Sequence, residues 1–307
     1  WCLSHPRAGH QAQQPGRCHP RLAGRAAGKK KWPDCHLTWL VNDSFAPLLE
    51  LAADVDEVML FHRQRWGRLS GWGDLLNFVR RELRQQSYDL VLDFQGLLRS
   101  GLLTLGSRSP RKVGFAAARE GATWFYDERC TPPPDCVHAV AKNLALARQV
   151  TGLSDQDALP AWRWPTALQA QVEALWQQHG LAHGEAVVAV APGARWASKR
   201  WPPGFFAAAL RELHQQDMPK PKFCLLGAPD ERPLAAALLA ELPDFPVVDL
   251  IGQTTLPMMA AILARTQALL CNDSGPMHLA AAVGRPAVAL FGPTDPARTG
   301  PWGTQHQ

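Results

Sequence analysis

The sequence predicts an α/β protein made of two doubly wound, Rossmann-like domains in tandem. Short apolar runs alternate with amphipathic stretches along most of the chain, and this alternation is interrupted once and then restarts. Strands that alternate with helices form a parallel sheet with helices on both faces. A chain of 307 residues is long enough for two domains of ordinary size.

The first domain is expected over residues 29–153, where the alternation is regular. Branched and aromatic residues bounded by turn formers predict its strands, at 37–41, 57–61, 88–94 and 113–115. Apolar residues at helical spacing predict its helices, at 45–53, 75–85, 97–105 and 137–151.

Residues 154–165 are polar, contain two prolines and lack a hydrophobic period, so we interpret them as an interdomain linker. The second domain is expected over 166–307. Its predicted strands are 186–191, 222–226, 247–250, 268–270 and 287–291. Its predicted helices are 167–179, 205–215, 233–242, 256–264 and 277–283. Two such domains facing across a cleft would bind their ligand there, at the carboxyl ends of the strands.

Composition excludes several classes of protein. No apolar run reaches membrane-spanning length, and the first residues have no apolar segment typical of a signal peptide. Seven scattered cysteines without a C-x-x-C pair indicate neither a zinc site nor a disulfide framework, which favours the cytoplasm. The net charge of +5 misleads, because residues 1–31 contribute +7 and the remainder carries −2. A nucleic-acid partner is therefore not predicted.

Residues 1–28 show no regular hydrophobic period and are expected to be aberrant or disordered. A doubly wound domain should begin with a strand, a turn and a helix before Lys29. Reading residues 11–20 one base-frame away permits the string KPSSLGDVIH, which has the turn that the fold lacks. We hypothesise that this segment is a frameshifted translation of the first βα unit. Codons that are incompatible with the string would contradict the hypothesis.

Four loops of the second domain follow the carboxyl ends of expected strands, at 192–193, 227–231, 273–275 and 292–295. After Ser274 or Gly275 as N-cap, Pro276 suits the first position of a helix. The N–H groups of such a helix start favour an anion, most often a phosphate. The alternative is an ordinary capped Asx turn.

Lys199 and Glu231 lie in loops of the same domain. Lys199 could pair with a phosphate, and Glu231 could accept hydrogen bonds from ribose hydroxyls. The alternatives are a surface lysine and a charge at a helix N-terminus. Four loops on one rim favour a nucleotide site. The absence of G-x-G-x-x-G and G-x-x-x-x-G-K-[ST] disfavours dinucleotide enzymes and P-loop NTPases.

A basic and aromatic stretch lies in the first domain. It comprises His62, Arg63, Arg65, Trp66, Arg68, Trp72, Arg80, Arg81 and Arg84. Taken singly, these residues are typical of a solvated helix face and loop. As a group they could contact an anionic substrate or a membrane surface.

The motif NDSGPMHL at 272–279, with FGPTDP at 291–296, resembles glycosyltransferase family 9, the lipopolysaccharide heptosyltransferases. The match covers about residues 29–303, and DFQGLLRS at 93–100 and residues 114–126 look most like heptosyltransferase I. The resemblance implies the GT-B fold and a cytoplasmic enzyme of Gram-negative bacteria. It implies inverting transfer of heptose from ADP-L-glycero-D-manno-heptose to the Kdo region of the inner core, without a metal or other cofactor.

The resemblance also implies roles at the donor diphosphate. Lys199 would bind the diphosphate and stabilise the leaving group, Ser274 and Gly275 would offer it backbone N–H groups, and His278 would lie near it. A lysine and a helix N-terminus together can stabilise the negative charge that develops on departing ADP.

For the other parts of the substrates, the resemblance implies that Asp273 contacts the heptose and Glu231 the ribose, with the backbone near Thr254 at the adenine. The acceptor would be the Kdo-lipid A portion of lipopolysaccharide, so peripheral contact with the inner face of the inner membrane is expected. The acceptor-side candidates are Gln95, Arg99 and Arg119.

The sequence departs from the family at both ends. The family's first motif, a basic residue followed by Ser-Ser-x-Gly-Asp, is missing, and with it the Asp that is expected to act as general base. The family's last helices are missing after Gln307. We therefore predict little or no activity for this chain. The alternatives are another GT-B sugar-nucleotide enzyme, such as a UDP-sugar transferase or an epimerase, and an inactive nucleotide-binding remnant.

Overall fold

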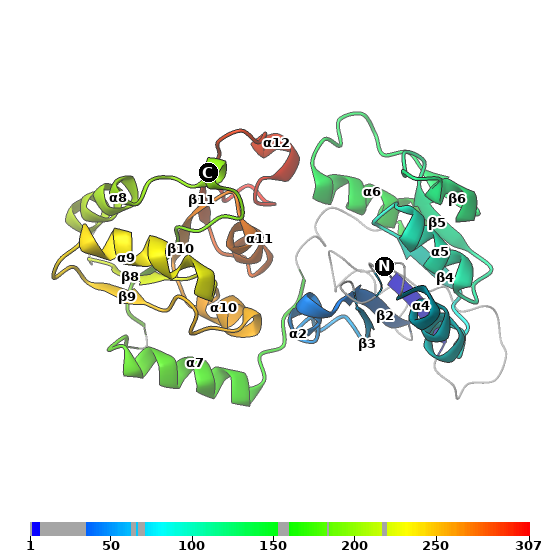
Figure 1. Ribbon diagram of the computed structural model, residues 1–307, viewed down its shortest axis with the longest axis horizontal. Helices are drawn as coiled ribbons and strands as arrows, with labels where there is room; N and C mark the ends of the chain where they lie inside the picture. The colour runs from blue at the N-terminus through cyan, green and yellow to red at the C-terminus, as the bar shows by residue number, and fades with distance from the viewer. Residues whose placement is uncertain are drawn as a thin grey trace. The chain divides into compact units, whose positions relative to one another are not determined.

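The computed structural model describes residues 2–6, 35–62, 66, 71–152, 160–182, 184–216 and 220–307. The chain divides into two compact units, Trp1–Arg163 and Trp164–Gln307, each built around its own sheet (Figure 1). The division falls inside the segment 154–165 that we interpreted as a linker. Within the described ranges, no helix combines the length and the apolar character that crossing a membrane requires.

Unit 1 contains a six-stranded sheet with the order β3-β2-β1-β4-β5-β6. Its strands are β1 (Cys2–Pro6), β2 (Cys35–Asn42), β3 (Glu57–Phe61), β4 (Leu90–Asp93), β5 (Lys112–Phe115) and β6 (Glu128–Cys130). The pairs β2–β3, β4–β5 and β5–β6 are parallel, as the alternation of strands and helices predicts. The short edge strand β6 was not predicted.

Strand β1 is the exception in this sheet, because it runs antiparallel to both of its neighbours, β2 and β4. We expected no folded element in residues 1–28, yet Cys2–Pro6 form this central strand. A doubly wound sheet would have a parallel strand in this position. Thus β1 supplies the backbone partners that β2 and β4 need, but in the opposite direction. Residues 7–34, on which the frameshift hypothesis rests, lie outside the described residues.

The helical elements of unit 1 lie between and after these strands. They are η1 (Asp43–Phe45), α2 (Ala46–Leu49), α4 (Trp72–Phe78), η3 (Val79–Leu83), α5 (Leu98–Gly106), η4 (Ala122–Phe125) and α6 (Ala139–Thr151). The helix expected at 45–53 is thus reduced to a 3-10 turn and one turn of α-helix. Helix α6 begins two residues later than predicted, because the His138 side chain caps it by accepting a hydrogen bond from the Val140 N–H.

Element η3 is a π-helical turn that continues α4. In a continuous α-helix, Glu82 would lie on the same stripe as the buried residues Leu75 and Phe78. A π turn contains one additional residue, which shifts that stripe forward by one position. Leu83 is consequently fully buried and Glu82 is exposed.

The core of unit 1 lies on both faces of its sheet. Along β4, Leu90 and Leu92 pack in one cluster with Trp39, while Val91 between them packs in the other cluster with Leu40. This alternation follows from the two-residue period of a strand. Burial of both faces is typical of a sheet that helices cover on each side.

Unit 2 contains a five-stranded, fully parallel sheet with the order β11-β10-β7-β8-β9. Its strands are β7 (Val187–Ala191), β8 (Lys222–Leu225), β9 (Val247–Asp249), β10 (Ala268–Asn272) and β11 (Ala287–Leu290). Its helical elements are α7 (Thr166–Gln178), η6 (Ala197–Lys199), α8 (Pro203–Gln216), η7 (Pro229–Glu231), α9 (Arg232–Ala240), α10 (Leu256–Leu263), α11 (Gly275–Ala282) and α12 (Pro296–Thr299). The five predicted strands and five predicted helices are confirmed, and α12 was not predicted.

Within each unit the strands follow the doubly wound order in which the first strand lies between the second and the fourth. The chain changes direction across the sheet between the first and fourth strands, which in unit 2 are β7 and β10. Ligands of such folds bind beyond the carboxyl ends of the strands at this switch point. A ligand site in unit 2 is therefore expected at the loops after β7 and β10.

Phe206 provides a test of the unit 2 core, because it is fully buried in α8 while its neighbour Phe205 is 58% exposed. Phe206→Ala should lower the free energy of unfolding by about 3–5 kcal/mol, through lost burial and the cavity left behind. Phe205→Ala should lower it by less than about 1 kcal/mol. Urea unfolding of both variants measures the difference, and equal losses would contradict this placement of α8.

Candidate functional site

Asp273, at the start of the loop after β10, is the centre of a polar cluster in unit 2. The Lys199 Nζ lies 2.5 Å from Asp273 Oδ2, and the Thr294 hydroxyl donates to the same oxygen at 2.5 Å. Only 7% of the Asp273 side chain is exposed. Burial alone would raise the pKa of Asp273, but hydrogen bonds from Lys199 and Thr294 and the charges of Lys199 and His278 hold that pKa below its usual value.

Asn272, the last residue of β10, connects the loops around this cluster. Its side-chain amide donates to the carbonyl oxygen of Pro192 at 2.7 Å, and its Oδ1 accepts from the Trp201 N–H at 3.0 Å. Asn272 is fully buried, so both bonds satisfy groups that water does not reach. The amide thereby fixes the loop after β7 and the segment that follows Lys199. From the sequence, Asn272 was predicted only as part of a motif, and this role was not predicted.

Helix α11 starts beside the cluster, at Gly275, with Ser274 as its N-cap. The Ser274 hydroxyl donates to the Asn272 carbonyl at 3.2 Å and caps no N–H group of the helix. Pro276 occupies the second position of α11, one later than predicted, where its missing N–H likewise leaves no donor unpaired. The start of α11 is thus suited to an anion, as the sequence indicated. His278 is exposed on the same helix.

Glu231 ends the 3-10 turn η7, in the loop after β8. Its Oε2 accepts a hydrogen bond from the Ala228 N–H at 2.9 Å. The carboxylate lies against the backbone at Gly193 and Gly227, so close that a Cβ atom at either glycine would overlap it. The absence of side chains at these two positions therefore allows Glu231 to reach the loop after β7 from the loop after β8.

Thr254 lies between β9 and α10. Its Oγ1 atom is buried and has no hydrogen-bond partner among the described residues. Buried polar atoms of this kind are uncommon, and one explanation is a ligand group that is bound there during function. The next residue, Thr255, caps α10 instead, with its hydroxyl accepting from the Met258 N–H at 3.3 Å.

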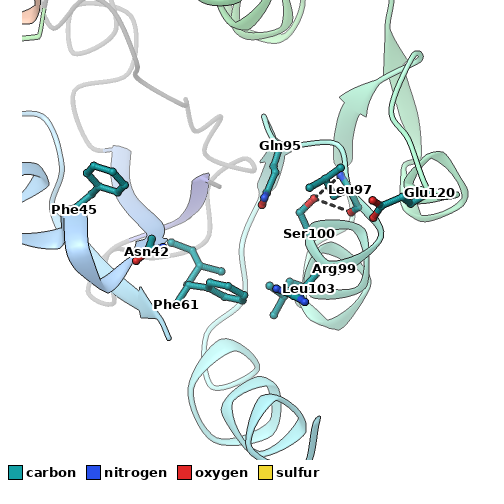
Figure 2. A pocket seen from close by; sticks show the side chains of 10 residues that line it. Asn42, Phe45, Phe61, Gln95, Leu97, Arg99, Ser100, Leu103 and Glu120 are labelled. Carbon is teal, nitrogen blue, oxygen red and sulfur yellow. Dashed lines mark hydrogen bonds between the residues drawn. The ribbon is translucent and has the colours of Figure 1, made fainter. Parts of the chain in front are cut away.

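Unit 1 contains a cavity of about 420 Å³ at the carboxyl ends of β2, β3 and β4 and the start of α5 (Figure 2). Its lining residues are Leu40, Asn42, Phe45, Phe61, Gln95, Leu97, Arg99, Ser100, Leu103 and Glu120. Two of the three acceptor-side candidates, Gln95 and Arg99, therefore lie in one cavity. The third, Arg119, is not among its lining residues.

The Arg99 guanidinium lies over the ring of Phe61, 5.9 Å from its centroid, in a cation–π contact. Nearby, the Glu120 Oε2 accepts a hydrogen bond from the Leu98 N–H at 3.2 Å. Glu120 has a φ of 56°, in the left-handed region that is unusual for a residue other than glycine. The cavity thus combines a permanent cation, an amide and a carboxylate, a set that suits a polar, charged sugar.

Asp93, the last residue of β4, holds the loop that carries Gln95. The carboxylate is fully buried; its Oδ1 accepts from the N–H groups of Gln95 at 2.9 Å and Gly96 at 3.2 Å. Its Oδ2 accepts from the Tyr126 hydroxyl at 2.7 Å. The Tyr126 ring packs on Gly114, where a Cβ would overlap it. Burial, and then the charge of Asp93, raises the pKa of Tyr126, so its hydroxyl remains a donor.

Within the described ranges, no group of three or more His, Cys, Asp and Glu side chains is arranged to hold a metal ion. Lys199 in unit 2 and Arg99 in unit 1 each provide a cationic group at one of the two sites.

Comparisons with known proteins relate the chain to one family of enzymes. A family model described as glycosyltransferase family 9 (heptosyltransferase) matches residues 77–307. The chain is 29% identical to lipopolysaccharide heptosyltransferase 1 of Pseudomonas aeruginosa, over 88% of this chain and 74% of that protein. It is 24% identical to the lipopolysaccharide core heptosyltransferase OpsX of Haemophilus influenzae, with the same coverage of each chain.

Solved structures show the same relationship at the level of the fold. A family 9 glycosyltransferase from Veillonella parvula matches with a TM-score of 0.76 and 21% identity, over 92% of this chain and 78% of that one. The E. coli heptosyltransferase WaaC with ADP matches with a TM-score of 0.74 and 24% identity, over 92% and 85%. The predicted GT-B fold is thereby confirmed, as is the resemblance to the family.

The Tyr126 hydroxyl allows a test of how the unit 1 cavity is held. Tyr126→Phe should keep the packing on Gly114 but leave a buried carboxylate oxygen of Asp93 without its donor, and cost about 1–3 kcal/mol of unfolding free energy. Trp124→Phe is the matched control, because Trp124 is 82% exposed on η4, and its effect should stay within about 0.5 kcal/mol. A Tyr126→Phe variant as stable as the control in urea titrations would show that the bond holds nothing in place.

Proposed function

The chain belongs to glycosyltransferase family 9, and on that premise we propose that it transfers L-glycero-D-manno-heptose from ADP-heptose to the Kdo region of the lipopolysaccharide inner core, with inversion at the anomeric carbon. The family makes it a glycosyltransferase. The observation that carries the proposal is the cluster of Lys199, Asp273 and Thr294 beside the start of α11, at the switch point of unit 2.

The donor diphosphate would bind Lys199 and the N–H groups at Ser274 and Gly275, with His278 nearby. The fixed position of these groups supports this, because Asn272 holds both flanking loops. As the bond to heptose breaks, negative charge develops on ADP. A preorganised ammonium group and a helix N-terminus stabilise such charge without rearranging, so the proposal requires neither a metal nor another cofactor.

The sugar and the base of the donor would meet the remaining polar groups of the rim. Asp273 would accept hydrogen bonds from heptose hydroxyls, and Glu231 would accept them from ribose hydroxyls. The unpartnered Oγ1 of Thr254 supports a place for adenine beside it, since adenine offers both a donor and acceptors.

The acceptor would bind in the unit 1 cavity, where Arg99 is positioned to pair with an acidic sugar. Kdo carries a carboxylate, and a guanidinium binds carboxylates with two parallel hydrogen bonds. Gln95 would recognise sugar hydroxyls from the loop that Asp93 holds. Arg119 would contribute from outside the cavity lining. The general base remains unassigned, because the sequence has no counterpart of the family's Asp. We therefore expect donor binding to be easier to detect than turnover.

The location of the reaction follows from the acceptor. Kdo-lipid A is a lipid, so we propose that the enzyme works in the cytoplasm at the inner face of the inner membrane. Whether the chain is nearer to heptosyltransferase I or II concerns the acceptor position, and our prediction of type I rests on the motifs at 93–100 and 114–126.

Nucleotide binding tests the donor assignment. ADP at one hundred times its dissociation constant should stabilise the chain by about 2.7 kcal/mol, whereas UDP should stabilise it far less. Lys199→Met should weaken ADP binding about tenfold or more, through loss of a charge-assisted bond to phosphate. Lys222→Met is the control, because Lys222 pairs with Glu185 instead. Thermal shift and calorimetry measure both effects, and stronger stabilisation by UDP would favour the UDP-sugar alternative.

The two glycines that accommodate Glu231 give a second test. Gly193→Ala should displace the Glu231 carboxylate and weaken ADP binding about tenfold, because the ribose would lose a charge-assisted partner. Gly204→Ala is the control, since a Cβ there would meet nothing within 4 Å. If calorimetry gave both variants the dissociation constant of the parent chain, Glu231 could not be the ribose ligand.

A further inference from the structure

Helix α4 presents an apolar face that the core of unit 1 does not use. Its buried side consists of Leu75 and Phe78. On the outer side, Trp72 is 41% exposed and Leu76 is 54% exposed, and the two are one helical turn apart. Two large apolar side chains side by side on a helix surface form a patch rather than isolated exposed residues, and such patches are typical of interaction sites.

Arginines continue this face beyond Leu76. Arg80, Arg81 and Arg84 are exposed on and directly after η3. The π turn contributes to this, because it buries Leu83 at a position that a regular α-helix would have exposed. The acidic residues of the same segment are Asp74, which is partly buried, and Glu82, which is exposed. Over residues 72–84 the arginines outnumber the acids by one.

We propose that the outer face of α4 and η3 docks on the surface of an anionic phospholipid bilayer. An indole ring and a leucine on one helix face suit the boundary between headgroups and acyl chains. Arginines beside them attract the headgroups of anionic lipids, each contributing while it stays within a Debye length of the surface. The helix therefore lies in the plane of the membrane and does not cross it.

Charge favours a lipid surface over the other partners that such a face could have. Of the exposed charged residues between 72 and 84, three are arginines and one, Glu82, is an acid, so the outer face carries a net positive charge. A nucleic acid would gain nothing from the leucine, and a hydrophobic protein partner would gain nothing from the arginines. A bilayer with anionic headgroups uses both at once. The proposal concerns α4 and η3 alone and does not depend on the donor or acceptor assigned above.

Sedimentation of the full chain with lipid vesicles tests the proposal. The chain should bind vesicles of phosphatidylglycerol mixed with phosphatidylcholine, and bind phosphatidylcholine alone much more weakly. Salt at about 0.5 M should release it from the anionic vesicles, because salt screens the attraction between the arginines and the headgroups. The double variant Trp72→Ser with Leu76→Ser should reduce the partition coefficient about tenfold. The triple variant Arg80→Gln, Arg81→Gln and Arg84→Gln should reduce it about as much and remove most of its salt dependence.

Trp124→Ser is the matched control, because Trp124 is the more exposed tryptophan and lies on η4 of the same unit. It should bind vesicles as the parent chain does. Parent chain that stays in the supernatant would overturn the proposal, and so would two variants that sediment as the control does. Equal binding to both kinds of vesicle would overturn the role of the arginines. Circular dichroism shows whether each variant is folded. If one variant fails to fold, the other still tests the proposal, because the two alter different residues.

Discussion

A buried polar side chain at the end of the fourth strand is the interaction on which each unit depends. In unit 2 this residue is Asn272, whose two hydrogen bonds fix the loop after β7 and the segment beyond Lys199. In unit 1 it is Asp93, which binds two N–H groups of the following loop and the hydroxyl of Tyr126. Both residues end the strand beside the switch point of the sheet, where an unpaired backbone would otherwise be free to move. A group that water cannot reach must be paired within the protein, so each side chain imposes one geometry on the loops around it.

The two units use this shared device for different chemistry. In unit 2 it places a lysine, a carboxylate and a helix start on one rim, a set of groups suited to a diphosphate and a sugar. In unit 1 it holds the loop that brings the Gln95 amide into a cavity, which the Arg99 guanidinium also lines, and these two groups together suit an acidic sugar. The doubly wound order explains the resemblance between the units, while the side chains after the strands determine which substrate each could bind.

Local patterns made most of the fold predictable, because strand and helix periods depend on neighbouring residues. Strands β7 to β11, helices α7 to α11 and the presence of Pro276 in the first turn of α11 follow directly from such patterns. Long-range pairs were not predictable in the same way. Nothing in the spacing of Asp93 and Tyr126, or of Lys199 and Asp273, indicates that their side chains meet, since only the folded sheet brings them together. The π turn η3 also escaped prediction, because it results from the competition between Glu82 and Leu83 for one buried position. Strand β1 shows a related limit, since it pairs antiparallel with β2 and β4, which lie far from it in the sequence.

The pairing of Lys199 with Asp273 means that the rim carries its own counterion. An arriving diphosphate would take the place of the Asp273 carboxylate beside Lys199, rather than bind an ammonium group that had no partner. Because the ammonium and the carboxylate have opposite charges and lie close together, their fields largely cancel at a distance, and salt screens what remains beyond a Debye length of about 8 Å. The pair therefore attracts distant anions only weakly. Discrimination is then left to contact, where the number and direction of hydrogen bonds decide which anion can replace the carboxylate. Small inorganic anions, which are abundant but make few such bonds, would compete poorly for this position.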